Sequence, residues 1–347
     1  MRIKNKRIVW RFSYTLAIVC FGGIFCTLFA RRKEKKILLE KGGIDENVLP
    51  RILMSNETSS SKSDFIQFDM NKRLWTMKNA CDKHGLSTRK DFDPLYRPNG
   101  WEFFVCHEFN LVWCSVFKSG SSSWMYIFNR LIGYKDAFLT SSKLPLVHLA
   151  RKKYSRPSGT ELVKAMNTST SFIVGRNPFE RLISGYRDKI LKAHVNSYHD
   201  QMKKKILMKY RGMLPKAYVS GVTNPTFQEF FRYIMKEYRR TNEMDMHWTP
   251  VYRFCNPCQV QFSDIIQFET FDRDTEFILK KTGILPRFPD IKPKKLNAAK
   301  DGKKSSDFIL GYLRELDEME YKELSELYQV DFDIFGYHLP TYREIHS

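Results

Sequence analysis

Short apolar runs that each lead through a polar turn into a helical pattern are the feature that most constrains this fold. Residues 103–117 read FFVCHEFNLVWCSVF and have strand character, and apolar positions recur at helical spacing over 122–132. Residues 171–175 and 264–268 predict further buried strands. Strand, turn and helix in repeated succession predict an α/β, three-layer domain with a mainly parallel central sheet. In such sheets ligands bind at the carboxyl ends of the strands.

Local signals mark the helices that should follow these strands. Asn177 before Pro178 is the order of a cap and a first helical residue, so a helix is expected to begin there. Another helix is expected from Asp272 to Lys281, and a final helix from Ser306 to Tyr328. The sequence has no internal repeat, which favours a single catalytic or binding domain.

The N-terminal region predicts a membrane anchor. Phe12 to Ala30 are 19 residues without a charge, enough to cross a hydrocarbon core. A cleaved signal peptide is the alternative, but the run is long and no small-x-small cleavage site precedes RRKEKK. Basic residues flank both sides equally, so they do not set the orientation. We expect a tail at 1–11, a signal anchor at 12–30, a polar stem at 31–73 and the catalytic domain at 74–347.

Cysteines and glycosylation sequons favour a lumenal body. Five cysteines follow the anchor: Cys81, Cys106, Cys114, Cys255 and Cys258. They predict two disulfides and one free thiol, with the pairing left open, although some could be small buried hydrophobes. Zinc at Cys255-x-x-Cys258 lacks the second ligand pair that it needs. Asn56 and Asn167 begin acceptor sequons, whereas a proline excludes Asn224.

The turn after 103–117 has the composition of an anion site. It reads FKSGSSSW from Phe117, with Gly120 and the hydroxyl groups of Ser119, Ser121, Ser122 and Ser123. A helix that begins there points free N–H groups at the turn, and Lys118 adds a full positive charge. A serine-capped helix with a surface lysine is the alternative. Because the lysine precedes the glycine, the Walker pattern is absent and a magnesium-dependent NTPase is disfavoured.

A second turn has similar chemistry. In FIVGRNPFERLISGYRDK, residues 172–189, Arg176 leaves a strand end and Ser184 lies about two turns into the following helix. An arginine beside a helix N-terminus with a serine donor can bind an anion. The alternative is a capped amphipathic helix with surface ion pairs. Two such turns in one α/β domain predict a ligand with two anionic groups.

The two turns resemble known loops of one enzyme family. FKSGSSSW (117–124) and RNPFERLIS (176–184) resemble the 5'-phosphosulfate and 3'-phosphate loops of Golgi carbohydrate sulfotransferases, in the chondroitin and dermatan N-acetylgalactosamine 4-O-sulfotransferase branch. Similar motifs are HWTPVYRFCNPC (247–258), IIQFETFDRD (265–274) and LYQVDFDIFGY (327–337). The resemblance covers about residues 100–337 and implies the P-loop-like sulfotransferase fold.

The resemblance implies a donor, 3'-phosphoadenosine 5'-phosphosulfate (PAPS). A sulfuryl group carries less charge than a transferring phosphoryl group, so no metal is expected. Lys118 would meet the 5'-phosphate and the bridging oxygen, and Arg176 with Ser184 would hold the 3'-phosphate. Phe117 replaces a common proline and Asn177 a common aspartate, and both keep their physical role. The predicted donor-binding residues are Phe117, Lys118, Ser119, Gly120, Ser121, Ser122, Ser123, Arg176, Asn177, Pro178, Phe179, Glu180, Arg181, Leu182, Ile183 and Ser184.

Sulfuryl transfer also needs a group that accepts the proton of the acceptor hydroxyl. Histidine is the usual base near neutral pH, and His247 is the first candidate because it lies in a shared motif. A histidine that only orients sugar is the alternative role. His148 and Glu269 are weaker candidates, and Glu269 could instead support the donor turn. Lys118 and His247 are thus the predicted catalytic residues.

The net charge of +20, from 58 basic and 38 acidic residues, favours a polyanion: nucleic acid, anionic lipid, a phosphorylated cofactor or an acidic polysaccharide. Together with the resemblance, it fits an acidic polysaccharide acceptor. Basic runs at 151–156, 203–211 and 292–295 could line its groove, with Trp248 or Tyr252 stacked on a sugar. The anchor and the lumenal cysteines argue against nucleic acid.

We therefore expect a single-pass type II Golgi membrane protein that sulfates C4 of N-acetylgalactosamine in chondroitin or dermatan. Sulfation of a terminal sugar on glycoprotein glycans and an inactive Golgi glycan-binding protein are the alternatives. The intact Lys118, Arg176 and Ser184 argue against the inactive form. The sequence does not predict the oligomeric state.

Overall fold

The computed structural model describes residues 59–88, 100–213, 223–294 and 308–347. The chain divides into two compact units, Met1–Lys62 and Ser63–Ser347, and the second contains nearly all of these residues. The predicted tail, the anchor at 12–30, most of the stem and Asn56 lie outside the described residues. Within the described ranges, no helix combines the length and apolar character needed to cross a bilayer.

A four-stranded sheet forms the centre of the second unit. Its strands lie in the order β1 (Phe103–Cys106), β2 (Leu111–Cys114), β3 (Thr170–Gly175) and β4 (Asp264–Gln267). The β1–β2 pair is antiparallel, whereas β2–β3 and β3–β4 are parallel. The prediction of a mainly parallel sheet is confirmed.

Residues 103–117, which were predicted to have strand character, form two strands joined in a hairpin. A 3-10 turn at His107–Phe109 and a left-handed Asn110, with φ of 44°, reverse the chain between β1 and β2. Every residue of both strands is buried. A strand that is covered on both faces reads as an uninterrupted apolar run, so the polar residues of the turn were the only signal of the reversal.

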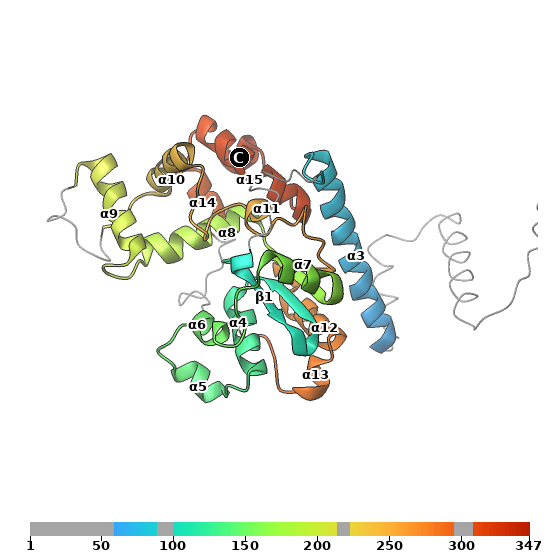
Figure 1. Ribbon diagram of the computed structural model, residues 1–347. Helices are drawn as coiled ribbons and strands as arrows, with labels where there is room; N and C mark the ends of the chain where they lie inside the picture. The colour runs from blue at the N-terminus through green and yellow to red at the C-terminus, as the bar shows by residue number, and fades with distance from the viewer. Residues whose placement is uncertain (1–58, 89–99, 214–222, 295–307) are drawn as a thin grey trace, which may run out of the picture. The chain divides into compact units, whose positions relative to one another are not determined.

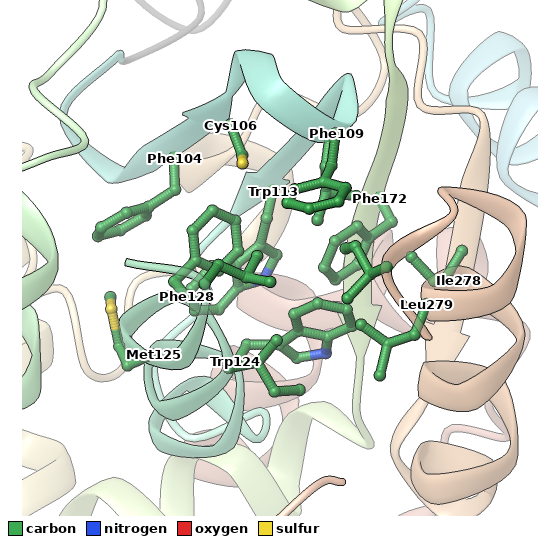
Figure 2. Close-up of a cluster of buried hydrophobic side chains, with 14 of the residues drawn as sticks. Phe104, Cys106, Phe109, Trp113, Trp124, Met125, Phe128, Phe172, Ile278 and Leu279 are labelled. Carbon is green, nitrogen blue, oxygen red and sulfur yellow. The ribbon is translucent and has the colours of Figure 1, made fainter. Parts of the chain in front are cut away.

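Helices cover both faces of the sheet, which confirms three layers. Alternate strand residues face opposite sides, so Phe104 and Trp113 pack under helices α4 (Ser121–Leu131) and α12 (Phe271–Lys281). Figure 2 shows this layer, in which Trp124 of α4 lies 4.2 Å, between ring centroids, from Phe172 of β3. The other face packs against α3 (Ser59–Lys83), α7 (Gly159–Thr168) and α11 (Val251–Phe254).

The domain begins earlier than the predicted boundary at residue 74. That position lies inside α3, and the compact unit starts at Ser63. Ile66 and Met70 of α3 are buried, and Arg73 forms a 2.6 Å ion pair with the fully buried Asp274 of α12. Because these contacts come from the last turns of the predicted stem, residues 63–73 belong to the folded domain.

A second region is made of helices around a core of its own. It contains α8 (Pro178–Gly185), the π-helix Tyr186–Leu191, α9 (Tyr198–Arg211), α10 (Phe227–Thr241), α14 (Ile309–Leu313), α15 (Glu318–Phe335) and α16 (Tyr342–His346). In Figure 1, α8, α9, α10 and α14 gather on one side of the sheet. Shorter helices α5 (Asp136–Ser141), α6 (Leu146–Arg151) and α13 (Ile284–Arg287) lie near α4 and α12.

The other predicted helices are confirmed with one exception. Those expected at 122–132, after Asn177 and at 272–281 correspond to α4, α8 and α12. The single final helix over 306–328 is wrong, because α14 ends at Leu313 and α15 begins after Asp317. Asp317 caps α15 in a reciprocal capping box with Glu320, which starts a new helix where one was expected to continue.

The cysteine prediction is confirmed, with two disulfides and one free thiol. Cys81 of α3 bonds Cys258, and Cys114 of β2 bonds Cys255 after α11. Cys106 is free and buried. Both cysteines of the Cys255-x-x-Cys258 pair are therefore used in disulfides and not in zinc binding.

Candidate active site

The Lys118 turn connects β2 to α4 and has an unusual backbone. Lys118 and Gly120 adopt left-handed conformations, with φ of 66° and 73°. A Cβ atom on Gly120 would lie 2.4 Å from the ring of Phe271, so only glycine fits there. Left-handed backbone is costly for a lysine, and such strain is concentrated at functional sites.

The turn gathers polar groups at the start of α4. The N–H group of Ser123 donates to the carbonyl oxygen of Gly120 at 3.0 Å. Ser119 is buried, and its Oγ has no hydrogen-bond partner among the residues that the structure describes. Ser121 and Ser122 are half-buried, while Ser123 donates to the carbonyl oxygen of Lys294 at 2.5 Å. An anionic ligand would supply the acceptor that Ser119 lacks.

The Lys118 ammonium is largely buried and paired. Its Nζ lies 2.6 Å from Oδ2 of Asp188 in the π-helix, and the side chain is 18% exposed. Burial lowers the pKa of Lys118, and the carboxylate of Asp188 opposes that shift. Asp188 also pairs with Lys189 at 3.2 Å. The carboxylate therefore neutralises Lys118 when no anion is present.

The second predicted turn contacts the first directly. Arg176 follows β3, and its Nη1 donates to the carbonyl oxygen of Lys118 at 2.7 Å. Nη2 lies 3.3 Å from Glu180, and the guanidinium stacks on Phe268 at 4.3 Å from the ring centroid. Burial lowers the pKa of Arg176, with Glu180 opposing. The two cationic turns thus lie side by side at the carboxyl ends of adjacent parallel strands.

Helix α8 begins as predicted, but several of its predicted site residues face the core. Asn177 accepts hydrogen bonds from the N–H groups of Phe179 and Glu180 and caps the helix. Phe179, Leu182 and Ile183 are fully buried among apolar residues, and Pro178 is buried too. Their side chains therefore pack in the helical core. Ser184 is half-buried.

Arg181, a predicted donor-binding residue, instead joins two loops. It is 1% exposed, and its Nη1 lies 3.5 Å from the carbonyl oxygen of Phe117 and 3.4 Å from that of His247. Its Nη2 donates to the carbonyl oxygen of Thr249. The buried guanidinium therefore fixes the loop of His247 against the Lys118 turn.

His247 lies beside the Lys118 turn for further reasons. Its ring contacts that of Phe117, with centroids 4.8 Å apart. A Cβ on Gly185 would come within 3.1 Å of the His247 carbonyl oxygen, so this glycine lets the loop approach α8 closely. The Trp248 carbonyl accepts from Tyr328, and Asp331 accepts from the N–H groups of Val251 and Tyr252. The loop is thus held on both sides.

The sequence reasoning missed Asp245, which hydrogen-bonds His247, and His199, which hydrogen-bonds Asp245. Nδ1 of His247 lies 2.6 Å from Oδ1 of Asp245, and Oδ2 of Asp245 lies 3.1 Å from Nε2 of His199 on α9. The two-residue spacing of Asp245 and His247 was a usable signal. No sequence signal links His199, because α9 reaches the loop only through tertiary packing.

The side chains of His199, Asp245 and His247 are also of the types that bind metal ions. Their ligand atoms lie within 4.8 Å of one another. However, hydrogen bonds engage both oxygens of Asp245 and one nitrogen of each histidine. The absence of a metal from the reaction remains a prediction.

The remaining candidates are dispersed. His148 is exposed on α6. Glu269 accepts a hydrogen bond from the Tyr337 hydroxyl at 2.7 Å and lies close to Arg176. Its alternative predicted role was to support the donor turn, and this position is compatible with that role. Trp248 is 1% exposed, so its predicted stacking on a sugar is wrong, whereas Tyr252 is half-buried. Asn167 is exposed on α7.

The predicted basic runs are only partly available to a ligand. Arg151 donates to the carbonyl oxygens of Phe103 and Trp101 and supports the sheet. Lys203 is 1% exposed, and Lys294 pairs with Asp136 at 2.6 Å. Exposed lysines remain in all three runs: Lys152, Lys153, Lys205, Lys209 and Lys292.

The parallel strands and the two joined cationic turns define an α/β protein with two cationic turns side by side at one end of its sheet. Comparison with protein-family models then identifies it more closely. The model described as "Sulfotransferase family" matches residues 101–338, and the chain belongs to this family.

Curated relatives agree with this assignment. The chain is 28% identical to carbohydrate sulfotransferase 8 of Mus musculus, over 78% of this chain and 64% of the relative. It is 29% identical to carbohydrate sulfotransferase 9 of Homo sapiens, over 78% of this chain and 60% of the relative. It is 25% identical to carbohydrate sulfotransferase 11 of Rattus norvegicus, over 77% of this chain and 75% of the relative. The chain thus spans less than two thirds of the first two relatives. No solved structure matches it.

Proposed function

We propose that this protein is a carbohydrate sulfotransferase that moves a sulfuryl group from PAPS to a glycosaminoglycan hydroxyl, at C4 of N-acetylgalactosamine in chondroitin or dermatan. The observation that carries the proposal is the 2.7 Å hydrogen bond between Arg176 and the Lys118 carbonyl oxygen. It brings the two cationic turns close enough to hold opposite ends of one nucleotide. Membership of the family implies PAPS as the donor.

The residues at the turns fit such a donor. Ser119 offers a buried hydroxyl with no hydrogen-bond partner among the described residues, Gly120 gives the turn its left-handed backbone, and the N-terminus of α4 carries the positive end of the helix dipole. Arg176 and Ser184 would hold the 3'-phosphate. When bound, the donor supplies the activated sulfuryl group. Glu180, another predicted donor residue, would orient Arg176 and would not touch the phosphate, because like charges repel.

Lys118 and His247 have separate roles in the proposed reaction. The Lys118 ammonium, at the end of β2, stabilises the negative charge that grows on the leaving nucleotide oxygen. Its burial strengthens this effect, since water screens it less. His247 accepts the proton of the sugar hydroxyl. Burial lowers the pKa of His247, with Asp245 opposing, and this favours the neutral imidazole that can accept a proton.

The acceptor and the cellular site are proposed on broader grounds. The three relatives are named carbohydrate sulfotransferases, which favours a sugar acceptor. The net charge of +20 favours an acidic polysaccharide. The two disulfides and the exposed Asn167 sequon fit a lumenal domain, and the apolar run at 12–30 would hold it in the Golgi membrane.

The test is transfer of labelled sulfate by the full chain in detergent. We would incubate it with labelled PAPS and, separately, desulfated chondroitin, dermatan, heparan and a glycoprotein with terminal N-acetylgalactosamine, and analyse the labelled disaccharides. Label at C4 in chondroitin or dermatan supports the proposal. Label at another position or only on the glycoprotein contradicts the acceptor assignment, and glycan binding without transfer identifies an inactive binding protein.

A further inference from the structure

We propose that Asp245 and His199 are positioning residues that hold His247 with its Nε2 free to accept the proton of the acceptor hydroxyl. This inference rests on the proposed function. It follows from the three-residue arrangement at the Lys118 turn, in which one carboxylate contacts two imidazoles from different parts of the chain.

The hydrogen bonds select the protonated nitrogen of each ring. Oδ1 of Asp245 lies 2.6 Å from Nδ1 of His247 and 2.9 Å from its backbone nitrogen, while Oδ2 lies 3.1 Å from Nε2 of His199. A carboxylate only accepts, so each imidazole donates its proton to it. His247 therefore carries its proton on Nδ1, which leaves the lone pair of Nε2 as the basic site.

The carboxylate remains ionised while it does this. Burial alone would raise the pKa of Asp245, but hydrogen bonds from His199 and His247 outweigh burial and hold the pKa well below its usual range. A fixed negative charge beside His247 stabilises the imidazolium that forms when it takes a proton. His199 contributes by holding the second oxygen, so the carboxylate plane cannot rotate away from His247.

The surrounding structure keeps the arrangement rigid. Ser197 caps α9 and accepts from the N–H of Asp200, next to His199. The carbonyl oxygen of Asp245 accepts from the N–H groups of Trp248 and Thr249 in a tight turn. The side chains of His199, Asp245 and His247 are only 12–16% exposed. These contacts fix both ends of the hydrogen-bonded chain.

The proton balance of the step is simple. The oxygen of the sugar hydroxyl loses its proton to Nε2 of His247 as it bonds to sulfur. The electron pair of the broken sulfur–oxygen bond stays on the nucleotide oxygen near Lys118. Asp245 and His199 exchange no proton, and His247 later returns the proton to water.

The pH profile separates positioning from a general structural role. The charged and titratable groups that act on His247 are Asp245, which raises its pKa, and Lys189 and His199, which lower it. Asp245→Asn should therefore move the acid limb of kcat/KM to lower pH. His199→Leu releases the second oxygen of Asp245 and should move the acid limb in the same direction, by a smaller amount. A merely structural loss would reduce activity without moving the limb.

The experiment uses the full chain with three variants. Asp245→Asn should lower kcat by about 10²-fold or more with KM within about threefold, because the wrong nitrogen of His247 is then protonated. His199→Leu should lower kcat by about tenfold. His199→Gln keeps an N–H donor toward Asp245 and should restore most of the activity. Affinity for 3',5'-adenosine bisphosphate and the melting temperature should stay near wild type in all three.

Three outcomes would overturn this inference. The first is wild-type kcat and an unshifted acid limb in both Asp245→Asn and His199→Leu. The second is equal loss in His199→Leu and His199→Gln. The third is activity that a chelator removes and Zn²⁺ restores, which would make the cluster a metal site. Failure of the proposed function looks different, because the unmodified chain would then transfer no sulfate to any carbohydrate.

Discussion

At the residue scale, Lys118 combines features that stability alone would not favour. It holds a left-handed backbone, and its ammonium is mostly buried beside Asp188. Strain of about 1 kcal/mol or more and the desolvation of a charge both oppose folding. Such a residue persists where its charge has a function, and the function that we propose for Lys118 is stabilisation of an anion at the end of β2.

Lys118→Ala should abolish transfer while leaving the fold intact. Loss of the charge should lower kcat by at least about 10²-fold, since one preorganised electrostatic contact contributes that much. Asp188 keeps Lys189 as a partner, so the free energy of unfolding should change by less than about 1 kcal/mol. Initial rates and urea unfolding measure both effects, and the exposed Lys192 gives a matched control in Lys192→Ala. Wild-type turnover in Lys118→Ala would remove the proposed role.

Arg176→Ala should reduce discrimination for the 3'-phosphate. A buried guanidinium that pairs with a phosphate contributes on the order of 2–5 kcal/mol, so affinity for 3',5'-adenosine bisphosphate should fall by at least about 30-fold. Affinity for adenosine 5'-monophosphate, which lacks the 3'-phosphate, should fall much less. Calorimetric titration of both nucleotides measures the difference.

Glu180→Gln provides the control of opposite sign. It removes the negative charge beside Arg176 without removing the guanidinium, so 3',5'-adenosine bisphosphate should bind as tightly as to wild type or more tightly. If Arg176→Ala instead weakens both nucleotides equally, its contact with the Lys118 carbonyl is its main role.

At the element scale, α4 and α12 set the shape of the donor turn. The left-handed Gly120 begins α4, and the ring of Phe271, the first residue of α12, fills the space beside it. The start of α4 was predictable from glycine, serines and helical spacing. The reason for the glycine was not, because Phe271 is distant in the sequence and reaches the turn only through packing of the two helices.

Gly120→Ala should destabilise the domain and weaken donor binding together. The added methyl clashes with Phe271 and strains the left-handed backbone, at a cost of about 1–3 kcal/mol. Combining it with Phe271→Ala should recover the part that comes from the clash but not the backbone part. A double-mutant cycle on urea unfolding and nucleotide affinity measures both. Strict additivity of the two substitutions would contradict the proposed contact.

At the scale of the whole molecule, the sequence predicted the layers and the two turns but not how the site closes. Buried strands and capped helices leave local signals, so the sheet, α4 and α8 were found. The hairpin at Asn110 and the break before α15 were not predicted, because each is marked only by a short polar stretch within a longer apolar or helical pattern. Arg181, Asp245 and His199 depend on tertiary packing, and a buried arginine that joins two loops resembles a surface arginine in the sequence.

The two disulfides join parts of the molecule that are far apart in the chain. Cys81–Cys258 and Cys114–Cys255 close segments with sequence separations of 177 and 141 residues. Loops of this length imply about 5 kcal/mol each in the chain-entropy model, and measured losses are typically about 2–5 kcal/mol. We expect each paired Cys→Ala variant to lower the free energy of unfolding by about 2–5 kcal/mol, as measured by urea unfolding.

The two bonds should differ in their effect on activity. Cys114 lies four residues before Lys118, and Cys255 follows α11, the helix after the His247 loop. Loss of this bond should therefore loosen both the Lys118 turn and the His247 loop. Cys81–Cys258 ties α3 to the loop beyond α11, further along the chain from these residues. Cys114→Ala/Cys255→Ala should therefore lower both transfer and stability, whereas Cys81→Ala/Cys258→Ala should lower mainly stability. The free Cys106 gives the control, because Cys106→Ala removes a thiol but no cross-link. An unfolding midpoint of the wild type that does not move under strong reductant would contradict this account of how the domain is held together.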